Sequence, residues 1–227
     1  MTQPIIVFDL DGTLIDTAPD LLDSLNHALV SGGVAPVDPI LHRAHVGFGG
    51  RVMIERAFLA QQRMLPDEDL QRLLAAFLDH YTAQIPGKSG PFPGVLQAMS
   101  NFRDAGYLMA ICTNKPERLA ISLMRGLALD TEFAAICGAD TFDFRKPDPR
   151  HLFETIARAG GDPDRALMIG DSRTDIDTAK AAGIPVVAVD FGYTDRHVRE
   201  FEPTHIISHF DELTVELAER LIASARG

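Results

Sequence analysis

Short apolar runs alternate with longer amphipathic segments along most of the chain. The runs are rich in β-branched residues and end at polar or glycine-containing loops, which is typical of buried parallel strands. They cover residues 5–8, 107–112, 133–137, 166–169, 185–189 and 204–207. The segments with helical spacing cover residues 95–105, 116–127, 149–159, 174–182 and 212–225. This alternation predicts an α/β fold with a doubly wound parallel sheet of the Rossmann-like type.

Residues 17–88 interrupt this alternation with three or four helical patterns and no convincing strand. The helical patterns cover residues 20–31, 39–45, 50–62 and 67–85. A stretch rich in glycine and proline, residues 86–94, then returns the chain to the α/β pattern. We therefore predict an α/β core formed by residues 1–16 and 89–227, with an inserted α-helical cap formed by residues 17–88. A length of 227 residues suits one core domain with such an insertion.

Charge and composition exclude several classes of function. The 21 basic and 32 acidic residues give a formal net charge of −11, so the protein repels nucleic-acid backbones and anionic membrane surfaces. No apolar run reaches the ~18–20 residues of a membrane-spanning helix, and the first residues lack the basic region of a secretion signal. Two cysteines cannot build a disulfide framework. We expect a cytoplasmic monomer or homodimer that binds neither nucleic acid nor membrane.

Polar side chains that could carry chemistry gather where predicted strands end. In an open parallel sheet, ligands bind beyond the carboxyl ends of the strands. The clusters are Asp9 with Asp11, Thr113 with Asn114, Lys146 alone, and Asp171 with Asp175. If the predicted fold is correct, these four clusters converge on one site.

The residue types in these clusters suit phosphoryl transfer. Asp9 and Asp11 could divide the roles of nucleophile and general acid–base, and Gly12 allows a tight turn beside them. Carboxylates gathered in one place repel one another unless a cation lies among them, and oxygen ligands without a His or Cys set favour magnesium. Lys146 and the Thr113 hydroxyl could then bind the remaining oxygens of a phosphoryl group.

Four motifs in order resemble those of the haloacid dehalogenase superfamily. They are DLDGTLID at 9–16, TN at 113–114, KPDP at 146–149 and GDSRTD at 170–175. The resemblance spans the chain and implies the core fold of that superfamily. The helical insert resembles the cap of the subgroup that contains phosphoglycolate phosphatase and β-phosphoglucomutase. The stretches HVGFGGR at 45–51 and FGYT at 191–194 are most similar to the phosphoglycolate phosphatase branch.

The resemblance implies roles for the four aspartates. Asp9 matches the nucleophile that forms an aspartyl phosphate. Asp11 matches the general acid that protonates the leaving alkoxide and then, as a base, activates water. Magnesium would be held by the Asp9 carboxylate, the Asp11 backbone carbonyl and Asp171, with Asp175 completing or orienting that shell.

Four further residues would bind the substrate. Thr113 and Lys146 match the phosphate-binding pair of the superfamily, with Lys146 also counted as catalytic, and Asn114 adds a contact. Arg51 opens a predicted cap helix after a glycine-rich loop and could pair with a substrate carboxylate, although a solvated arginine fits the same position equally well.

The resemblance implies a magnesium-dependent phosphatase for a small phosphorylated metabolite, with 2-phosphoglycolate as the leading substrate. Asp11 disfavours a dehalogenase, which lacks the second aspartate, and the absence of lysine between Thr17 and Gly87 disfavours a phosphonate-cleaving enzyme. A β-phosphoglucomutase, a pyrophosphatase, a nucleotidase and a sugar-acid phosphatase remain alternatives, as does a non-enzymatic binding module. We expect the cap to close over the core on hinges near Thr17 and residues 87–93.

Overall fold

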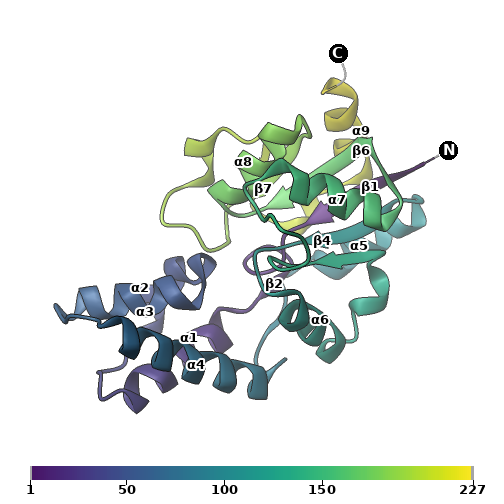
Figure 1. Ribbon diagram of the computed structural model, residues 1–227. Helices are drawn as coiled ribbons and strands as arrows, with labels where there is room; N and C mark the ends of the chain where they lie inside the picture. Colours follow the sequence, from purple (N-terminus) through teal and green to yellow (C-terminus); the bar gives the residue numbers. More distant parts are fainter. Residues whose placement is uncertain (1, 226–227) are drawn as a thin grey trace.

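The computed structural model describes residues 2–225 and has an α/β part and a helical part (Figure 1). A six-stranded sheet with the order β5-β4-β1-β6-β7-β8 forms the centre of the α/β part, and every neighbouring pair is parallel. Its strands are β1 (Gln3–Phe8), β4 (Leu108–Cys112), β5 (Ala135–Cys137), β6 (Gly161–Gly170), β7 (Val186–Val189) and β8 (His205–Ile207). This sheet confirms the predicted Rossmann-like α/β fold.

The order of the strands reverses beside β1. From β1 the chain moves outward through β4 to β5, then returns to the other side of β1 and moves outward through β6 and β7 to β8. A reversal of this kind opens a crevice at the carboxyl ends of the strands. A ligand site is therefore expected at the carboxyl ends of β4, β1 and β6, which lie nearest this point.

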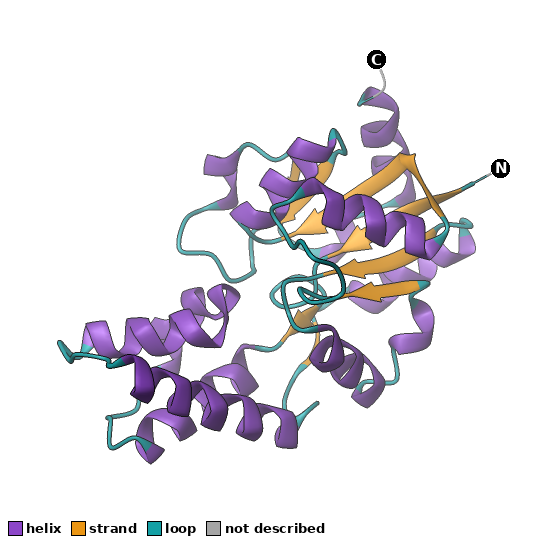
Figure 2. Cartoon of the chain, in the orientation of Figure 1, coloured by secondary structure: helices purple, strands orange, loops and turns teal. Residues whose placement is uncertain are grey.

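Helices cover both faces of the sheet (Figure 2). The helices of the α/β part are α5 (Val95–Asp104), α6 (Glu117–Gly126), α7 (Pro149–Ala159), α8 (Arg173–Ala182) and α9 (Val215–Ser224). Alternate residues of β1 point to opposite faces, so Ile6 and Phe8 pack with α5, α6 and α9, while Ile5 and Val7 pack with α7 and α8. In the described part of the chain, no helix combines the length and hydropathy needed to cross a membrane.

Element boundaries differ from the prediction where backbone pairing and caps outweigh the apolar pattern. β6 begins at Gly161 because Gly161 pairs with Gln3 before a register shift, although the next residues are mostly exposed. The last helix begins at Val215 because a 3-10 turn, Phe210–Glu212, precedes it and the Thr214 hydroxyl caps it. The predicted helix 39–45 ends at His42 and continues as a 3-10 helix.

The helical part has its own hydrophobic core. It contains α1 (Ala18–Ser31), α2 (Pro39–His42), α3 (Gly49–Ala60) and α4 (Asp67–Gln84). Apolar residues of α1, α3 and α4 pack together, and Leu119 and Tyr193 of the α/β part join them. The predicted cap boundaries, residues 17 and 88, enclose these four helices, and the division into two domains stays a prediction.

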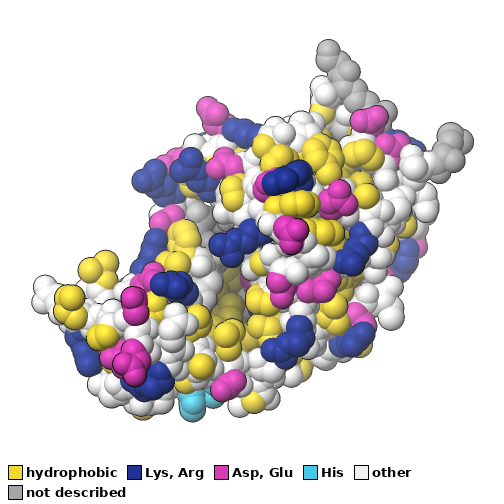
Figure 3. Space-filling view, in the orientation of Figure 1, with side chains coloured by type: hydrophobic (Ala, Val, Ile, Leu, Met, Phe, Trp, Pro, Cys, Tyr) yellow, Lys and Arg dark blue, Asp and Glu magenta, His cyan; other side chains and the backbone are white. Residues whose placement is uncertain are grey.

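Two chain crossings join the helical part to the α/β part, and they are tied to each other. Short strands β2 (Ile15–Asp16) and β3 (Gly90–Pro91) pair antiparallel at the crossings. The buried carboxylate of Asp20 in α1 also accepts hydrogen bonds from the backbone N–H groups of Lys88 and Ser89 and from the Ser89 hydroxyl. The surface is hollowed where the two parts meet, with basic side chains beside the hollow (Figure 3).

Candidate active site

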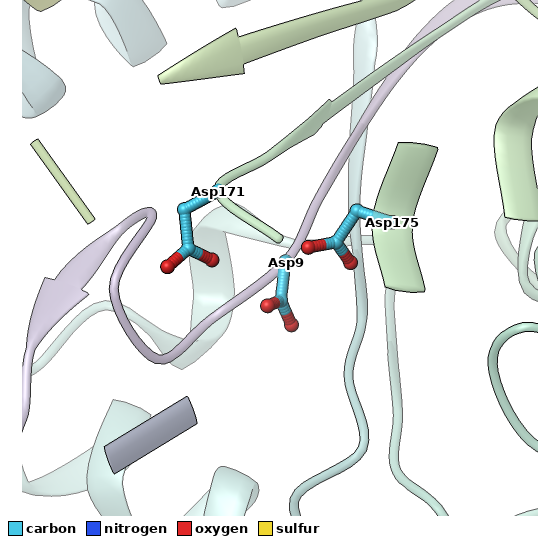
Figure 4. Close-up of side chains that lie close together, drawn as sticks. All are labelled: Asp9, Asp171 and Asp175. Atoms are coloured by element: carbon cyan, nitrogen blue, oxygen red, sulfur yellow. The ribbon is translucent and has the colours of Figure 1, made fainter. Parts of the chain in front are cut away.

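The four predicted clusters meet at the carboxyl ends of the central strands. Asp9 directly follows β1, Thr113 directly follows β4 and Asp171 directly follows β6. Lys146 lies between β5 and α7, and Asp175 lies in the first turn of α8. Figure 4 shows the Asp9, Asp171 and Asp175 side chains together at this point.

Asp9, Asp171 and Asp175 form a buried cluster of carboxylates. One oxygen of each lies within 4.8 Å of the others. Burial and the neighbouring Asp175 raise the pKa of Asp9 to about 6, and burial with the same neighbour raises the pKa of Asp171 well above its usual range. Lys146 Nζ lies 2.8 Å from Asp9 Oδ1, so one ammonium faces three carboxylates. This concentration of negative charge favours a bound cation.

Asp171 is held in one position by hydrogen bonds and by close backbone approach. The Thr13 hydroxyl donates to Asp171 Oδ1 at 3.1 Å, and the Tyr193 backbone N–H donates to Oδ2 at 2.6 Å. A Cβ atom at Gly12 or at Gly192 would collide with the Asp171 side chain, and Gly12 also has a φ of +84°. The loop from 191 to 194 therefore shapes the carboxylate cluster, a contact that spacing along the chain did not reveal.

Lys146 is paired with two of these carboxylates. Its Nζ lies 2.8 Å from Asp9 Oδ1 and 2.5 Å from Asp175 Oδ1, and burial, which lowers the pKa of a lysine, is outweighed by these two charges. The other oxygen of Asp175 accepts from the backbone N–H and hydroxyl of Ser172, the residue that caps α8. Asp175 thus orients Lys146 and stabilises the first turn of α8. Its role in metal binding stays a prediction.

Thr113 and Asn114 follow β4, and Asn114 contacts the loop of Lys146. The Thr113 backbone N–H donates to the Cys137 carbonyl at 3.0 Å, and its side-chain oxygen accepts from the Lys115 backbone N–H at 3.1 Å. The Asn114 amide donates to the Lys146 carbonyl at 3.0 Å and so holds the loop that carries the lysine. Their predicted contacts with phosphate stay predictions.

Asp11 has a partner that the sequence reasoning missed. The Thr17 hydroxyl donates to Asp11 Oδ1 at 2.7 Å, and Lys115 Nζ donates to the same oxygen at 3.0 Å. Lys115 is buried. Its place directly after the Thr113–Asn114 pair, at the end of β4, was the one signal that could have singled it out.

Arg51 does not join the cluster in this structure. It lies in the first turn of α3 with a side chain that is 57% exposed, and its Nε donates to Glu55 one turn later, at 2.9 Å. Its contact with a substrate carboxylate stays a prediction. Arg43 of the helical part instead reaches the α/β boundary, where it pairs with Asp16 at 2.9 Å and lies over the Tyr193 ring.

Known proteins resemble this chain over nearly its whole length. A family model described as haloacid dehalogenase-like hydrolase matches residues 6–189. A phosphoglycolate phosphatase from Mesorhizobium japonicum is 69% identical over 225 residues, 99% of each chain. One from Agrobacterium fabrum is 48% identical over 223 residues, 97% of this chain and 95% of that protein.

A solved structure has the same architecture. The crystal structure of a predicted phosphoglycolate phosphatase from Haemophilus somnus 129PT superposes with a TM-score of 0.85 at 27% identity, covering 94% of this chain and 97% of that one. The predicted resemblance to the phosphoglycolate phosphatase branch is thereby confirmed, as is the prediction of an enzyme in the class of phosphoric monoester hydrolases. The chain belongs to the haloacid dehalogenase-like hydrolase family.

Proposed function

We propose that this protein is a magnesium-dependent phosphatase that hydrolyses 2-phosphoglycolate through an aspartyl phosphate, a mixed anhydride formed on Asp9. The observation that carries the mechanism is the environment of Asp9. Its buried carboxylate lies at the reversal of strand order, 2.8 Å from the ammonium of Lys146 and beside Asp171. The choice of substrate is supported by the two relatives named phosphoglycolate phosphatase, at 69% and 48% identity.

The residues present fit a magnesium ion. Asp9 and Asp171 offer carboxylate oxygens within 4.8 Å of each other, burial raises the pKa of both, and close packing at Gly12 and Gly192 holds the Asp171 carboxylate in place. Asp9, Asp171 and the backbone carbonyl of Asp11 would hold the ion. When bound, it supplies positive charge against the carboxylates and the phosphoryl oxygens.

The protein's own side chains supply the remaining chemistry. The Asp9 carboxylate attacks phosphorus, and Asp11 donates a proton to the departing alkoxide. Asp11 then takes a proton from the water that hydrolyses the aspartyl phosphate, which releases inorganic phosphate and restores the Asp9 carboxylate. Lys146 and Thr113 bind phosphoryl oxygens, so the charge that develops in the transition state meets donors that are already in place.

The other sequence-based expectations belong to this proposal. The ligand is a small phosphorylated metabolite, and neither nucleic acid nor membrane is a partner. The protein is cytoplasmic and works as a monomer or a homodimer. A net charge of −11 supports the exclusion of polyanions, while the local cluster of magnesium and Lys146 accepts one small phosphate ester.

A screen of phosphorylated metabolites tests the proposal. We expect the highest kcat/KM for 2-phosphoglycolate, and loss of turnover when a chelator removes magnesium. A higher kcat/KM for hexose phosphates, nucleotides or pyrophosphate would reject 2-phosphoglycolate as the substrate, while the assignment as a phosphatase would stand. Formation of glucose 6-phosphate from β-glucose 1-phosphate would indicate a mutase. No turnover of any phosphate ester, p-nitrophenyl phosphate included, would indicate a binding module.

A further inference from the structure

Lys115 is a buried lysine that the reaction described above does not use. Only 8% of the residue is exposed, and its Nζ lies 3.0 Å from Asp11 Oδ1 and 3.3 Å from Asp11 Oδ2. Burial lowers the pKa of a lysine, but the Asp11 carboxylate raises the pKa of Lys115 by more, so the ammonium stays charged. A buried charge that touches both oxygens of one carboxylate restricts how that carboxylate can turn.

The helical part covers this ammonium. Tyr81 of α4 is 1% exposed, and Lys115 Nζ lies 4.5 Å from the centre of its ring, within the range of a cation–π contact. Burial raises the pKa of the Tyr81 hydroxyl, so this group stays neutral beside the ammonium. Tyr81 of the cap thus packs against the lysine and holds it near the core, and this contact adds no second negative charge beside the ammonium.

Asp11 is consequently held from two sides. Lys115 reaches it from the end of β4, and the Thr17 hydroxyl reaches it from the first crossing between the two parts, at 2.7 Å. General acid catalysis depends on the direction in which the acid presents its proton. Both of these contacts engage Oδ1, whereas Oδ2 lies farther from Lys115, at 3.3 Å, so Oδ2 is the oxygen left to carry the proton and its direction is set by the hold on Oδ1.

We propose that Lys115 is a positioning residue that orients Asp11 for proton transfer to the leaving alkoxide, and that Tyr81 of the cap keeps Lys115 in place. The inference rests on the proposed phosphatase mechanism and extends it to two residues. A rival role, in which Lys115 binds the substrate carboxylate, is disfavoured because a substrate would first have to displace Asp11 from both of its contacts.

The leaving group distinguishes these roles. An alkoxide such as that of ethyl phosphate or 2-phosphoglycolate needs a proton as it leaves, whereas p-nitrophenolate is stable without one. The constant kcat/KM reports only the steps up to the formation of the aspartyl phosphate on Asp9, so the later use of Asp11 as a base does not obscure the comparison. For Lys115→Met we expect a loss of about 100-fold with both alkyl phosphates and less than about 10-fold with p-nitrophenyl phosphate.

Further variants complete the test. Lys180→Met makes the same change at an exposed lysine of α8 and serves as the control, with no change for any of the three substrates. Tyr81→Leu should show the same selectivity for alkyl phosphates with a smaller loss, because the ring no longer seats the ammonium. Lys115→Arg, which keeps the charge, should lower the ratio of alkyl to aryl turnover by less than Lys115→Met does.

Three results would overturn the assignment. Equal losses with all three substrates would mean that Lys115 is merely structural, and a loss confined to 2-phosphoglycolate would mean that it binds the substrate carboxylate. If Lys115→Met does not fold, Tyr81→Leu carries the test, and an unchanged alkyl-to-aryl ratio in that variant also rejects the assignment. Wild-type turnover of ethyl and p-nitrophenyl phosphates without turnover of 2-phosphoglycolate would reject the proposed substrate alone, and the Lys115 comparison would proceed with the first two.

Discussion

Lys146 Nζ lies 2.5 Å from Asp175 Oδ1, and both side chains are almost wholly buried. The second oxygen of Asp175 is engaged by Ser172 at the start of α8. Asp175 therefore has two roles. One of its oxygens stabilises the start of α8, and the other holds the Lys146 side chain in place. Removing one partner of a buried ion pair leaves the other charge in a medium that solvates it poorly.

Asp175→Ala should therefore destabilise the protein strongly. We expect a loss of about 2 kcal/mol in the free energy of unfolding, because the variant loses the shorter ion pair of Lys146 and the Asp175 half of the capping box of α8, while Lys146 keeps Asp9 as a partner. Chemical denaturation with a chelator present measures it without a contribution from metal. Asp177→Ala removes an exposed ion pair of the same helix and should cost less than about 0.5 kcal/mol. Equal losses in the two variants would contradict this account.

Asp9→Asn should abolish turnover, and Asp11→Asn should nearly abolish it, with both proteins folded. Asparagine keeps the size of each side chain but is a poor nucleophile and cannot act as an acid. Turnover of p-nitrophenyl phosphate and circular dichroism measure the two properties. Mass spectrometry after rapid quenching should find phosphate on Asp9 in the wild type and none in Asp9→Asn. Full activity in Asp9→Asn would rule out the nucleophilic role.

Asp171→Asn should stabilise the metal-free protein while abolishing its response to magnesium. The raised pKa of Asp171 means that burial disfavours its charge, so a neutral side chain relieves that cost. Asparagine can keep both partners, accepting from Tyr193 and donating to the Thr13 oxygen. Thermal unfolding with and without magnesium measures both effects. Wild type should gain about 2.7 kcal/mol at a magnesium concentration 100 times Kd.

The matched control for this experiment is Asp177→Asn, at a partly exposed aspartate of α8 that lies outside the carboxylate cluster. It should respond to magnesium as the wild type does. A wild-type melting temperature that magnesium does not change, or an Asp171→Asn protein that magnesium still stabilises, would contradict the assignment of this carboxylate.

His151 should make the protein less stable in acid. It is buried in α7, where burial and the charge of Lys146 lower its pKa to about 4. An unfolded histidine has a pKa of about 6.5, so between these values the unfolded state binds more protons and stability falls as pH falls. The loss amounts to about 2 kcal/mol at pH 5 relative to neutral pH.

Urea unfolding at pH 7.5 and pH 5 measures this effect. His151→Gln should lose less stability between the two pH values than the wild type does. His197→Gln, at an exposed histidine, should behave as the wild type. The same pH dependence in all three proteins would show that the acid sensitivity comes from other groups.

The α/β fold and the placement of the polar clusters at the strand ends were largely readable from local patterns. The run Ile5–Phe8 is buried on both faces of the sheet, and its end at Asp9 predicted both a strand and a strand-end carboxylate. Prediction was weaker at element ends. The start of β6 was missed because Gly161 pairs with Gln3, a contact between segments about 160 residues apart that leaves no apolar pattern.

The sequence by itself determined which side chains leave the strand ends, because periodicity and turn chemistry are local properties. Tertiary structure alone decided how those side chains pair. Lys115 meets Asp11 across 104 positions, and Tyr193 meets Asp171 across 22. Tyr81 of the helical part covers Lys115. Arg51, whose position at the start of a cap helix predicted a substrate contact, pairs with Glu55 instead. Such pairings depend on which charges packing brings together away from water, and that is a property of the folded chain as a whole.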